Sequence, residues 1–445
     1  MVIEKIKAAL FACFHRPGQN VYAAIVFIIL FSGCAGSPGI SEVQLSSGQN
    51  GLFVRDLYCP ASGYIVAIGS TSRAKQDGIA LYSKDRGATW HRAALEPPAT
   101  GVALTLAQLP SGGPAPRLYA SGYRSLNPFS DEPAPWWVSE DGGRTWSSAT
   151  FRLPLGKPRG FSPSFPKIVA ADQTGTLVAV VAESTGLLSN GVFLLRSTDS
   201  GEHWDKRLLK MPTDHASPIV SDGKGHLAFF GSSIPGHPFS AAYESGVYWS
   251  SDAGATWREG KAPANKSFLF TMSLYRSTPS GDMVAFNTTQ RKYGSTVIFH
   301  SADNGQSWEK SSGPGEFGTI IGITGDGRRR IVALTDFGNV LLSDDAGVTW
   351  RNAGRPAVSS KRLHCAASPM IFAGQKTIIA AAGSKIIRSS DGGDTWVTTD
   401  SRLPDADHCF STLCTDGNGL IVAAGGGMIM RSVDFGITWD RGKVE

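Results

Sequence analysis

The sequence predicts an all-β fold, a β-propeller of eight four-stranded antiparallel blades, and three observations support that prediction. One eight-residue motif, Ser-x-Asp-x-Gly-x-x-Trp, occurs eight times along the 445 residues. Short runs of β-prone residues, separated by Gly-containing turns, surround each copy. Gly (52 residues) and Trp (11 residues) are abundant, whereas charged residues make up only 18% of the chain. Repeats of about 45 residues with four strands each are typical of propeller blades.

The composition excludes several classes of protein. Hydrophobic residues make up 41% of the chain, enough for a sizeable core, so a disordered or collagen-like chain is excluded. The formal net charge of +5 is mild and no block of Lys or Arg stands out, so nucleic acid is not predicted as a partner. One large all-β domain can reach this length, so the chain need not contain several domains.

The segment 1–33 is predicted to be a lipoprotein signal peptide. Basic residues precede an apolar run at 21–31, which suits a signal sequence and is too short to span a bilayer. The Ser-Gly-Cys sequence that follows resembles a bacterial lipobox, which implies that Cys34 is lipidated and begins the mature chain. Residues 34–50 would then form a tether. The alternative is an ordinary signal peptide cleaved near Ala35 or Gly36.

The residue after Cys34 is Ala35 rather than Asp. By resemblance to enterobacterial sorting signals, this favours the outer membrane. The sequence therefore predicts an exported outer-membrane lipoprotein, and it leaves open whether the domain faces the periplasm or the cell surface.

The repeated motif predicts a tight turn in each of eight units. Its Asp can accept hydrogen bonds from backbone N–H groups of the turn, its Gly can supply a positive φ, and its Trp offers a large apolar face for packing. The copies are SKDRGATW (83–90), SEDGGRTW (139–146), STDSGEHW (197–204), SSDAGATW (250–257), SADNGQSW (301–308), SDDAGVTW (343–350), SSDGGDTW (389–396) and SVDFGITW (432–439). The aspartates expected to be structural are Asp85, Asp141, Asp199, Asp252, Asp303, Asp345, Asp391 and Asp434.

The spacing of the units predicts how many blades there are. A Pro follows each of the first seven motif tryptophans by six or eight residues, where it would end the fourth strand, because Pro cannot donate to a ladder. Eight complete units then fit into residues 51–445 as a single domain. A seven-bladed ring with one atypical unit is the alternative.

These octapeptides resemble the Asp-box, or BNR, repeat of sialidases. The same repeat occurs in sortilin-type receptors, xyloglucan-degrading glycosidases and photosystem II assembly factors. The resemblance covers nearly all of 51–445, and it implies a propeller with the boxes at the turns between strands three and four. In these families the boxes lie away from the ligand face, so a structural role is expected for the box residues.

The resemblance to sialidases extends only partly to their active site. Phe53-Val54-Arg55 resembles the arginine motif of the first sialidase blade, with an inserted Val, and Arg73 and Asp77 fall roughly where a second arginine and the acid are found. The Tyr–Glu nucleophile pair has no counterpart in the sequence. We therefore expect Arg55 and Arg73 to be solvated charges at strand ends, and we predict no catalytic residue, cofactor or metal site.

Four cysteines follow the tether, and export would place them in an oxidising compartment. Cys365 and Cys409 fall at similar strand-one positions of blades seven and eight, which suits a disulfide. Cys59 and Cys414 match in register in blades one and eight, so a second disulfide would join the two ends of the ring. Buried free thiols remain an alternative, as does a metal site formed with the histidines that precede Cys365 and Cys409.

Ligand binding is expected on the face opposite the boxes, where the connections between strands two and three lie. These connections are short in blades six to eight and longer in blades two to five, where aromatic residues beside charges suit a saccharide or a protein partner. The candidate residues are Tyr123, Arg124, Trp136, Trp137, His237, Tyr243, Arg291 and Tyr293. For Trp136, a core position in strand three is the alternative.

Together these features predict a monomeric, exported, membrane-anchored propeller that acts as a non-catalytic binding or assembly scaffold for a protein or glycan ligand. The alternative is a sialidase-like or xyloglucanase-like hydrolase. That activity would need two carboxylates about 5–10 Å apart beside aromatic side chains.

Overall fold

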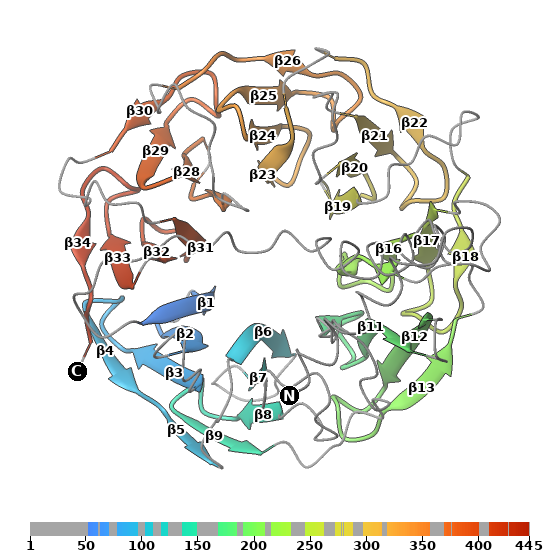
Figure 1. The fold of residues 1–445 in the computed structure, drawn as a ribbon, viewed down its shortest axis with the longest axis horizontal. Helices are drawn as coiled ribbons and strands as arrows, with labels where there is room; N and C mark the ends of the chain where they lie inside the picture. Colours follow the sequence, from blue (N-terminus) through green and yellow to red (C-terminus); the bar gives the residue numbers. More distant parts are fainter. Residues whose placement is uncertain are drawn as a thin grey trace, which may run out of the picture. The chain divides into compact units, whose positions relative to one another are not determined.

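The computed structural model confirms an all-β, eight-bladed propeller. It describes residues 52–60, 63–70, 78–96, 103–109, 117–122, 136–148, 168–184, 190–209, 215–232, 245–261, 272–276, 278, 280–287, 297–313, 318–356, 369–374, 376–399, 409–425 and 427–444. All of them belong to the second of two units, Leu45–Glu445. Strands are the regular elements of this part of the chain, and they form eight sheets arranged in a ring (Figure 1). No helix suited to crossing a bilayer is found among these residues.

Each of blades one to four takes its antiparallel strands from one continuous stretch of sequence. Blade one contains β1 (Phe53–Tyr58), β2 (Ile65–Ser70), β3 (Gly78–Ser83) and β4 (Thr89–Arg92). Blade two contains β6 (Ala103–Leu109), β7 (Arg117–Gly122), β8 (Trp136–Ser139) and β9 (Thr145–Ser148), and blade three contains β10 (Val169–Ala170), β11 (Leu177–Ser184), β12 (Asn190–Ser197) and β13 (Asp205–Leu208). Blade four contains β14 (His215–Ala216), β15 (Val220–Ser221), β16 (Leu227–Ser232), β17 (Ser245–Ser250) and β18 (Arg258–Glu259). Its first strand is split between β14 and β15 at Pro218, which cannot donate to the ladder.

Blades five to eight repeat this order. Blade five contains β19 (Met272–Arg276), β20 (Met283–Asn287), β21 (Ile298–Ser301) and β22 (Glu309–Lys310), and blade six contains β23 (Ile320–Gly325), β24 (Ile331–Thr335), β25 (Val340–Ser343) and β26 (Arg351–Asn352). Blade seven contains β27 (Met370–Phe372), β28 (Ile378–Ala382), β29 (Lys385–Ser389) and β30 (Val397–Thr398), and blade eight contains β31 (Phe410–Thr415), β32 (Ile421–Gly425), β33 (Met428–Ser432) and β34 (Asp440–Arg441). In Figure 1 the first strands lie toward the centre of the ring and the fourth strands lie on its outside.

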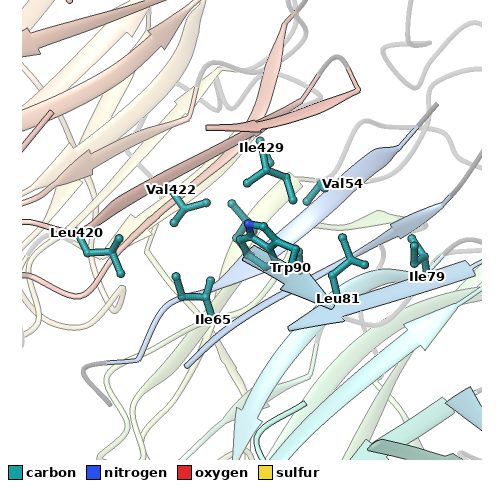
Figure 2. Packing of buried hydrophobic residues seen from close by; sticks show 11 residues of the cluster. Val54, Ile65, Ile79, Leu81, Trp90, Leu420, Val422 and Ile429 are labelled. Carbon is teal, nitrogen blue, oxygen red and sulfur yellow. The ribbon is translucent and has the colours of Figure 1, made fainter. Parts of the chain in front are cut away.

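The hydrophobic core is divided among the interfaces between neighbouring blades. Eight clusters of buried hydrophobic residues each combine side chains from two successive blades, and one of them joins blade eight to blade one. Because both faces of a blade are covered, the second strands are buried throughout, as in β2, β24 and β28. At the closing interface, Trp90 of blade one packs with Val422 and Ile429 of blade eight (Figure 2). The ring is therefore closed by the same kind of packing that joins its other blades.

A parallel pairing at the outer edge also joins neighbouring blades. The tail that follows the fourth strand of a blade pairs with the start of the fourth strand of the next blade, as β5 (Ala94–Glu96) does with β9. Single bridges between Lys261 and Ser307 and between Ser312 and Thr349 repeat this contact. At the closure, β35 (Lys443–Val444) pairs with β4, and the N–H of Lys443 donates to the carbonyl of Ala88 at 2.9 Å.

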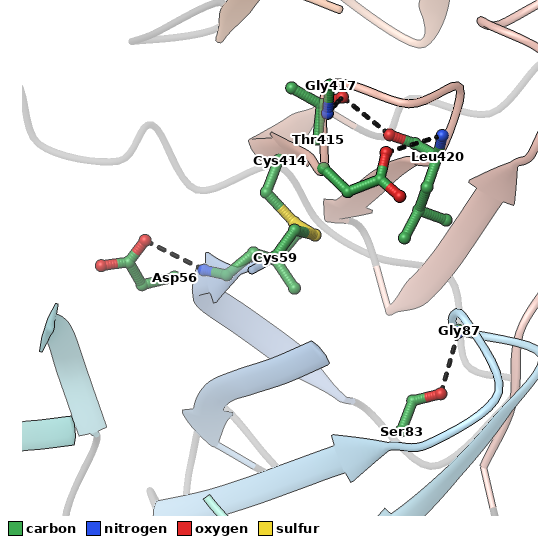
Figure 3. The surroundings of a disulfide bond; sticks show 10 residues. Asp56, Cys59, Ser83, Gly87, Cys414, Thr415, Gly417 and Leu420 are labelled. Atoms are coloured by element: carbon green, nitrogen blue, oxygen red, sulfur yellow. Dashed lines mark hydrogen bonds between the residues drawn. A yellow bond between two sulfur atoms is a disulfide. The ribbon is translucent and has the colours of Figure 1, made fainter. Parts of the chain in front are cut away.

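A disulfide between Cys59 and Cys414 joins blade one to blade eight (Figure 3). The two residues are 355 positions apart in the sequence, and their Cα atoms lie 5.6 Å apart. This is the pairing expected where the chain ends meet. Cys409 is disulfide-bonded as well, but Cys365 lies outside the described residues, so its pairing with Cys409 stays a prediction. The predicted signal peptide, the tether and Cys34 also lie outside them.

Candidate functional site

The Asp boxes form one recurrent hydrogen-bonded turn, present in all eight blades. The Ser hydroxyl donates to the Asp carboxylate at 2.7–2.8 Å and accepts the Gly N–H at 2.7–3.0 Å. The Trp Nε1–H donates to the Gly carbonyl at 2.9–3.2 Å. The Gly φ lies between +80° and +101°, where a residue with a Cβ is disfavoured. Every fixed position of the motif therefore has a structural role.

The seventh position of the box takes part in this turn, which the sequence analysis did not recognise. Its backbone N–H donates to the Asp carboxylate at 2.8–3.0 Å in all eight boxes. In seven boxes its Thr or Ser hydroxyl donates to the second carboxylate oxygen at 2.5–2.7 Å, and in the third box His203 Nδ1 lies 2.7 Å from Asp199. The near-constant hydroxyl at this position was the available signal.

The turns hold the box carboxylates in the ionised state. Burial opposes the charge of Asp85, but hydrogen bonds from Thr89 and Ser83 outweigh that effect and lower its pKa to about 2. The backbone N–H of His203 has the largest effect on Asp199, whose pKa is also about 2. The pKa values of the other six box aspartates are lowered too. These groups are therefore hydrogen-bond acceptors at neutral pH and are not proton donors.

We expect the ring to lose stability in acid because these carboxylates have a lower pKa in the folded state. For Asp391 the folded value is about 2 against 3.8 for the free side chain, so its stabilising effect is complete above pH 4 and is lost as the pH falls toward 2. Urea unfolding followed by Trp fluorescence should show a midpoint that decreases between these two pH values. Asp391→Asn should lower the midpoint at neutral pH and make the acid-induced decrease smaller. A midpoint that does not change between pH 4 and pH 2 would contradict this account.

A second set of aspartate turns lies on the same face as the boxes, which we call the box face. In four of the turns between strands one and two, an Asp carboxylate accepts the N–H groups two and four residues later, at 2.7–3.1 Å. The aspartates are Asp172, Asp222, Asp326 and Asp416. In blades three to eight the N–H of the fourth box residue also donates to a carbonyl of the neighbouring turn of that blade. The box face is thus a rigid surface of interlinked turns.

The opposite face, which we call the loop face, contains the connections between the second and third strands. Most of the predicted ligand residues lie outside the described residues, namely Tyr123, Arg124, His237, Tyr243, Arg291 and Tyr293. Trp136 begins β8, and its side chain is not among those described. Among the described parts of this face, Phe337 is exposed in the short turn between β24 and β25.

Trp137 corrects one expectation of the sequence analysis. It was predicted to contact a ligand, but its side chain is only 2% exposed and packs at the interface of blades one and two, beside Trp146. Trp137 lies within β8, where it pairs with β7 and β9, and both faces of a blade are covered by its neighbours. Trp137 therefore has almost no surface to offer to a ligand.

Arg55 also lies elsewhere than predicted. It was expected at a strand end, but it falls in the middle of β1, where the register with β2 shifts between Val54 and Asp56. The same irregularity occurs in β6, β23 and β31. Arg55 is exposed on this innermost strand, and the hydroxyl of Ser411 in blade eight donates to the Val54 carbonyl at 2.9 Å. A guanidinium in this place is suited to binding an anionic group such as a carboxylate.

The geometry defines the class of protein as an eight-bladed β-propeller with one Asp box in each blade. The described residues contain no cluster of His, Cys, Asp and Glu that could hold a metal ion. On the box face, the described residues form a rigid surface in which the box carboxylates accept hydrogen bonds from their own turns. The described residues also include an exposed arginine on the innermost strand of blade one.

Solved structures with a similar fold include proteins with different activities. YCF48 bound to a D1 peptide has a TM-score of 0.46 and 14% identity, and the match covers 90% of this chain and 99% of YCF48. An α-L-arabinanase of Penicillium chrysogenum complexed with arabinobiose has a TM-score of 0.36 and 14% identity, covering 63% and 88% of the two chains. The Hadza microbial sialidase has a TM-score of 0.34 and 16% identity, covering 71% and 75%. No protein-family model and no curated protein matches the chain. Likenesses at this level do not discriminate between binding and hydrolysis.

Proposed function

We propose that this chain is an exported β-propeller, anchored to the outer membrane, that acts as a non-catalytic binding or assembly scaffold for a protein or glycan ligand. The observation that supports it most is the difference between the two faces of the ring. On the box face, short turns are linked by hydrogen bonds into a rigid surface. On the loop face, residues 123–135, 233–244 and 288–296 connect the middle strands of blades two, four and five. Rigid frames with long connections on one face are typical of binding proteins.

The chemistry of the described residues favours binding over hydrolysis. A glycosidase needs a carboxylic acid with a raised pKa that can protonate the leaving group. The box carboxylates have lowered pKa values and are occupied by their own turns, as at Asp85 and Asp391. The exposed charge on β1 is the guanidinium of Arg55, which can bind an anion and does not transfer protons at neutral pH.

The function can be tested with residues 35–445, purified in the oxidised form. We expect binding to members of a glycan array or to an immobilised protein ligand, with no turnover of fluorogenic sialosides or of xyloglucan oligosaccharides. Tyr123→Ala combined with Arg124→Ala should weaken the binding, whereas Asn304→Ala on the box face should leave it unchanged. Hydrolysis above the blank would overturn the proposal and favour the sialidase-like or xyloglucanase-like alternative.

The membrane anchor gives a separate prediction. Replacing Cys34 with Ser removes the sulfur that a lipid would modify, so the exported protein should move from the membrane fraction to the soluble fraction. Cys13→Ser, within the predicted signal peptide, is the matched control and should leave the distribution unchanged. Fractionation with detection by immunoblot measures both. A Cys34→Ser protein that stays with the membrane would contradict lipidation at this residue.

A further inference from the structure

The eighth Asp box differs from the other seven in the residues between its fixed positions. Its second, fourth and sixth residues are Val433, Phe435 and Ile437, which we call the apolar turn. At the same three positions the other boxes have Lys84, Arg86 and Ala88; Glu140, Gly142 and Arg144; Thr198, Ser200 and Glu202; Ser251, Ala253 and Ala255; Ala302, Asn304 and Gln306; Asp344, Ala346 and Val348; and Ser390, Gly392 and Asp394. The fold of the box therefore does not require large apolar residues there.

All three side chains of the apolar turn are exposed to solvent. Val433 is 46% exposed, Phe435 37% and Ile437 59%. Together with Val397 and Val444 they make five of the eight exposed large hydrophobic side chains among the described residues, and these five lie within residues 397–444. Val433, Phe435 and Ile437 alone share one turn, and exposed apolar side chains this close together on a turn suit a protein contact site.

The backbone of the apolar turn has the conformation common to the boxes and is fixed by hydrogen bonds. Phe435 has a φ of +60°, which is costly for an aromatic residue. Its N–H donates to the carbonyl of Gly419 at 3.0 Å, and its carbonyl accepts Nε–H of Arg388 at 2.8 Å. One edge of the ring lies beside Gly374 and the other beside Gly419, since a Cβ on these glycines would lie 3.1 or 3.3 Å from it. The apolar turn is therefore pre-organised and does not need to rearrange on binding.

Three basic residues, Arg86, Arg388 and Lys376, and two carboxylates, those of Asp416 and Asp434, lie on or beside the apolar turn, so these charges sum to a small positive value. The carboxylate of Asp434 accepts hydrogen bonds from its own box, and that of Asp416 accepts two N–H groups and pairs with Arg86 at 3.2 Å. Arg388 contacts the carbonyl of Phe435, and the exposed Lys376 follows Gly374 by two residues. A partner that complements this surface has apolar side chains next to acidic ones.

We propose that the apolar turn is a docking site for a segment of a partner protein that combines apolar and acidic residues. A membrane surface fits less well, because interfacial side chains enter the bilayer by about 5–10 Å, whereas Phe435 is only 37% exposed and its ring lies beside Gly374 and Gly419. This site is separate from the ligand site proposed on the loop face.

The test uses the mature chain and a triple variant built from the chain's own boxes. Val433→Thr, Phe435→Asn and Ile437→Gln introduce residue types that the third and fifth boxes already have at these positions, and Asn304 has a φ of +61° there. The triple variant should therefore fold, which its urea midpoint checks. Val348→Gln, at the sixth position of the sixth box, is the matched control outside the apolar turn.

The probe is a short fluorescent peptide in which Leu and Glu alternate, and fluorescence anisotropy measures its binding. We expect it to bind the mature chain and to bind the triple variant about tenfold or more weakly. Two control variants should bind the peptide as the unchanged chain does: Val348→Gln, and Tyr123→Ala combined with Arg124→Ala. In contrast, Lys376→Glu should weaken the binding. Equal binding by the triple variant, or equal binding of a peptide with Lys in place of Glu, would overturn the proposal. So would binding to phosphatidylglycerol vesicles without peptide binding, or self-association that the triple variant abolishes.

Discussion

Replacing Cys59 and Cys414 together with Ser is expected to lower the free energy of unfolding by about 2–5 kcal/mol, because a cross-link over a long loop restricts the unfolded chain strongly. The disulfide joins residues 355 positions apart, and each blade takes its four strands from one stretch of sequence. In the described part of the chain, β35 is the strand from the end of blade eight that joins the sheet of blade one. The disulfide is therefore the covalent part of a closure that otherwise depends on packing, on β35 and on polar contacts such as Arg86–Asp416.

Urea unfolding of the oxidised proteins, followed by Trp fluorescence, measures this effect. Reducing agent is not a sufficient test, since it would also open the disulfide of Cys409. The double Ser variant isolates the closing bond. If its unfolding midpoint equals that of the unchanged chain, the disulfide does not contribute to closing the ring.

Replacing Trp90 with Ala is expected to destabilise the ring by about 3–5 kcal/mol, the usual cost of removing a buried aromatic side chain. Trp90 is fully buried at the interface between blades one and eight, and its Nε1–H donates to Gly87 at 3.0 Å (Figure 2). The loss would leave a cavity between two blades and an unpaired carbonyl in the first box. Urea unfolding at neutral pH provides the measurement.

Trp396 is the matched control for this substitution. It occupies the same box position in blade seven and makes the same hydrogen bond, at 2.9 Å to Gly393, but its side chain is only half-buried. Trp396→Ala should therefore cost clearly less than Trp90→Ala, because part of its ring is already in contact with water. Equal losses for the two variants would show that the hydrogen bond, and not the packing between blades, determines the contribution of the box tryptophan.

The number of blades and the role of the boxes could be predicted because the same signal occurs eight times. A single Ser-x-Asp-x-Gly-x-x-Trp would have been a weak indication, but eight copies at similar spacing fix the repeat unit and its phase. The turn is also local, since Asp85 and the other box aspartates bond to residues within the same octapeptide. Local chemistry of this kind can be read from residue types.

Other features depend on how strands pair and could not be predicted. Trp137 is the second residue of β8, so the sequence alone could not separate this strand from the connection that precedes it. The position of Arg55 follows from a register shift in β1, which has no signature in the sequence. Phe435 lies beside Gly374 and Gly419, which belong to turns of two neighbouring blades, and the sequence alone does not place these turns side by side. The loop-face connections do not repeat, so no periodicity defines their conformation.

The central claim is that eight blades close into one ring in which the first and last blades meet. Mass spectrometry of the exported protein, digested without reduction, tests it most directly, because only that closure brings Cys59 and Cys414 to within bonding distance. The account predicts a disulfide-linked peptide pair that contains these two cysteines. Free thiols at both positions, or Cys59 linked to a different cysteine, would contradict it.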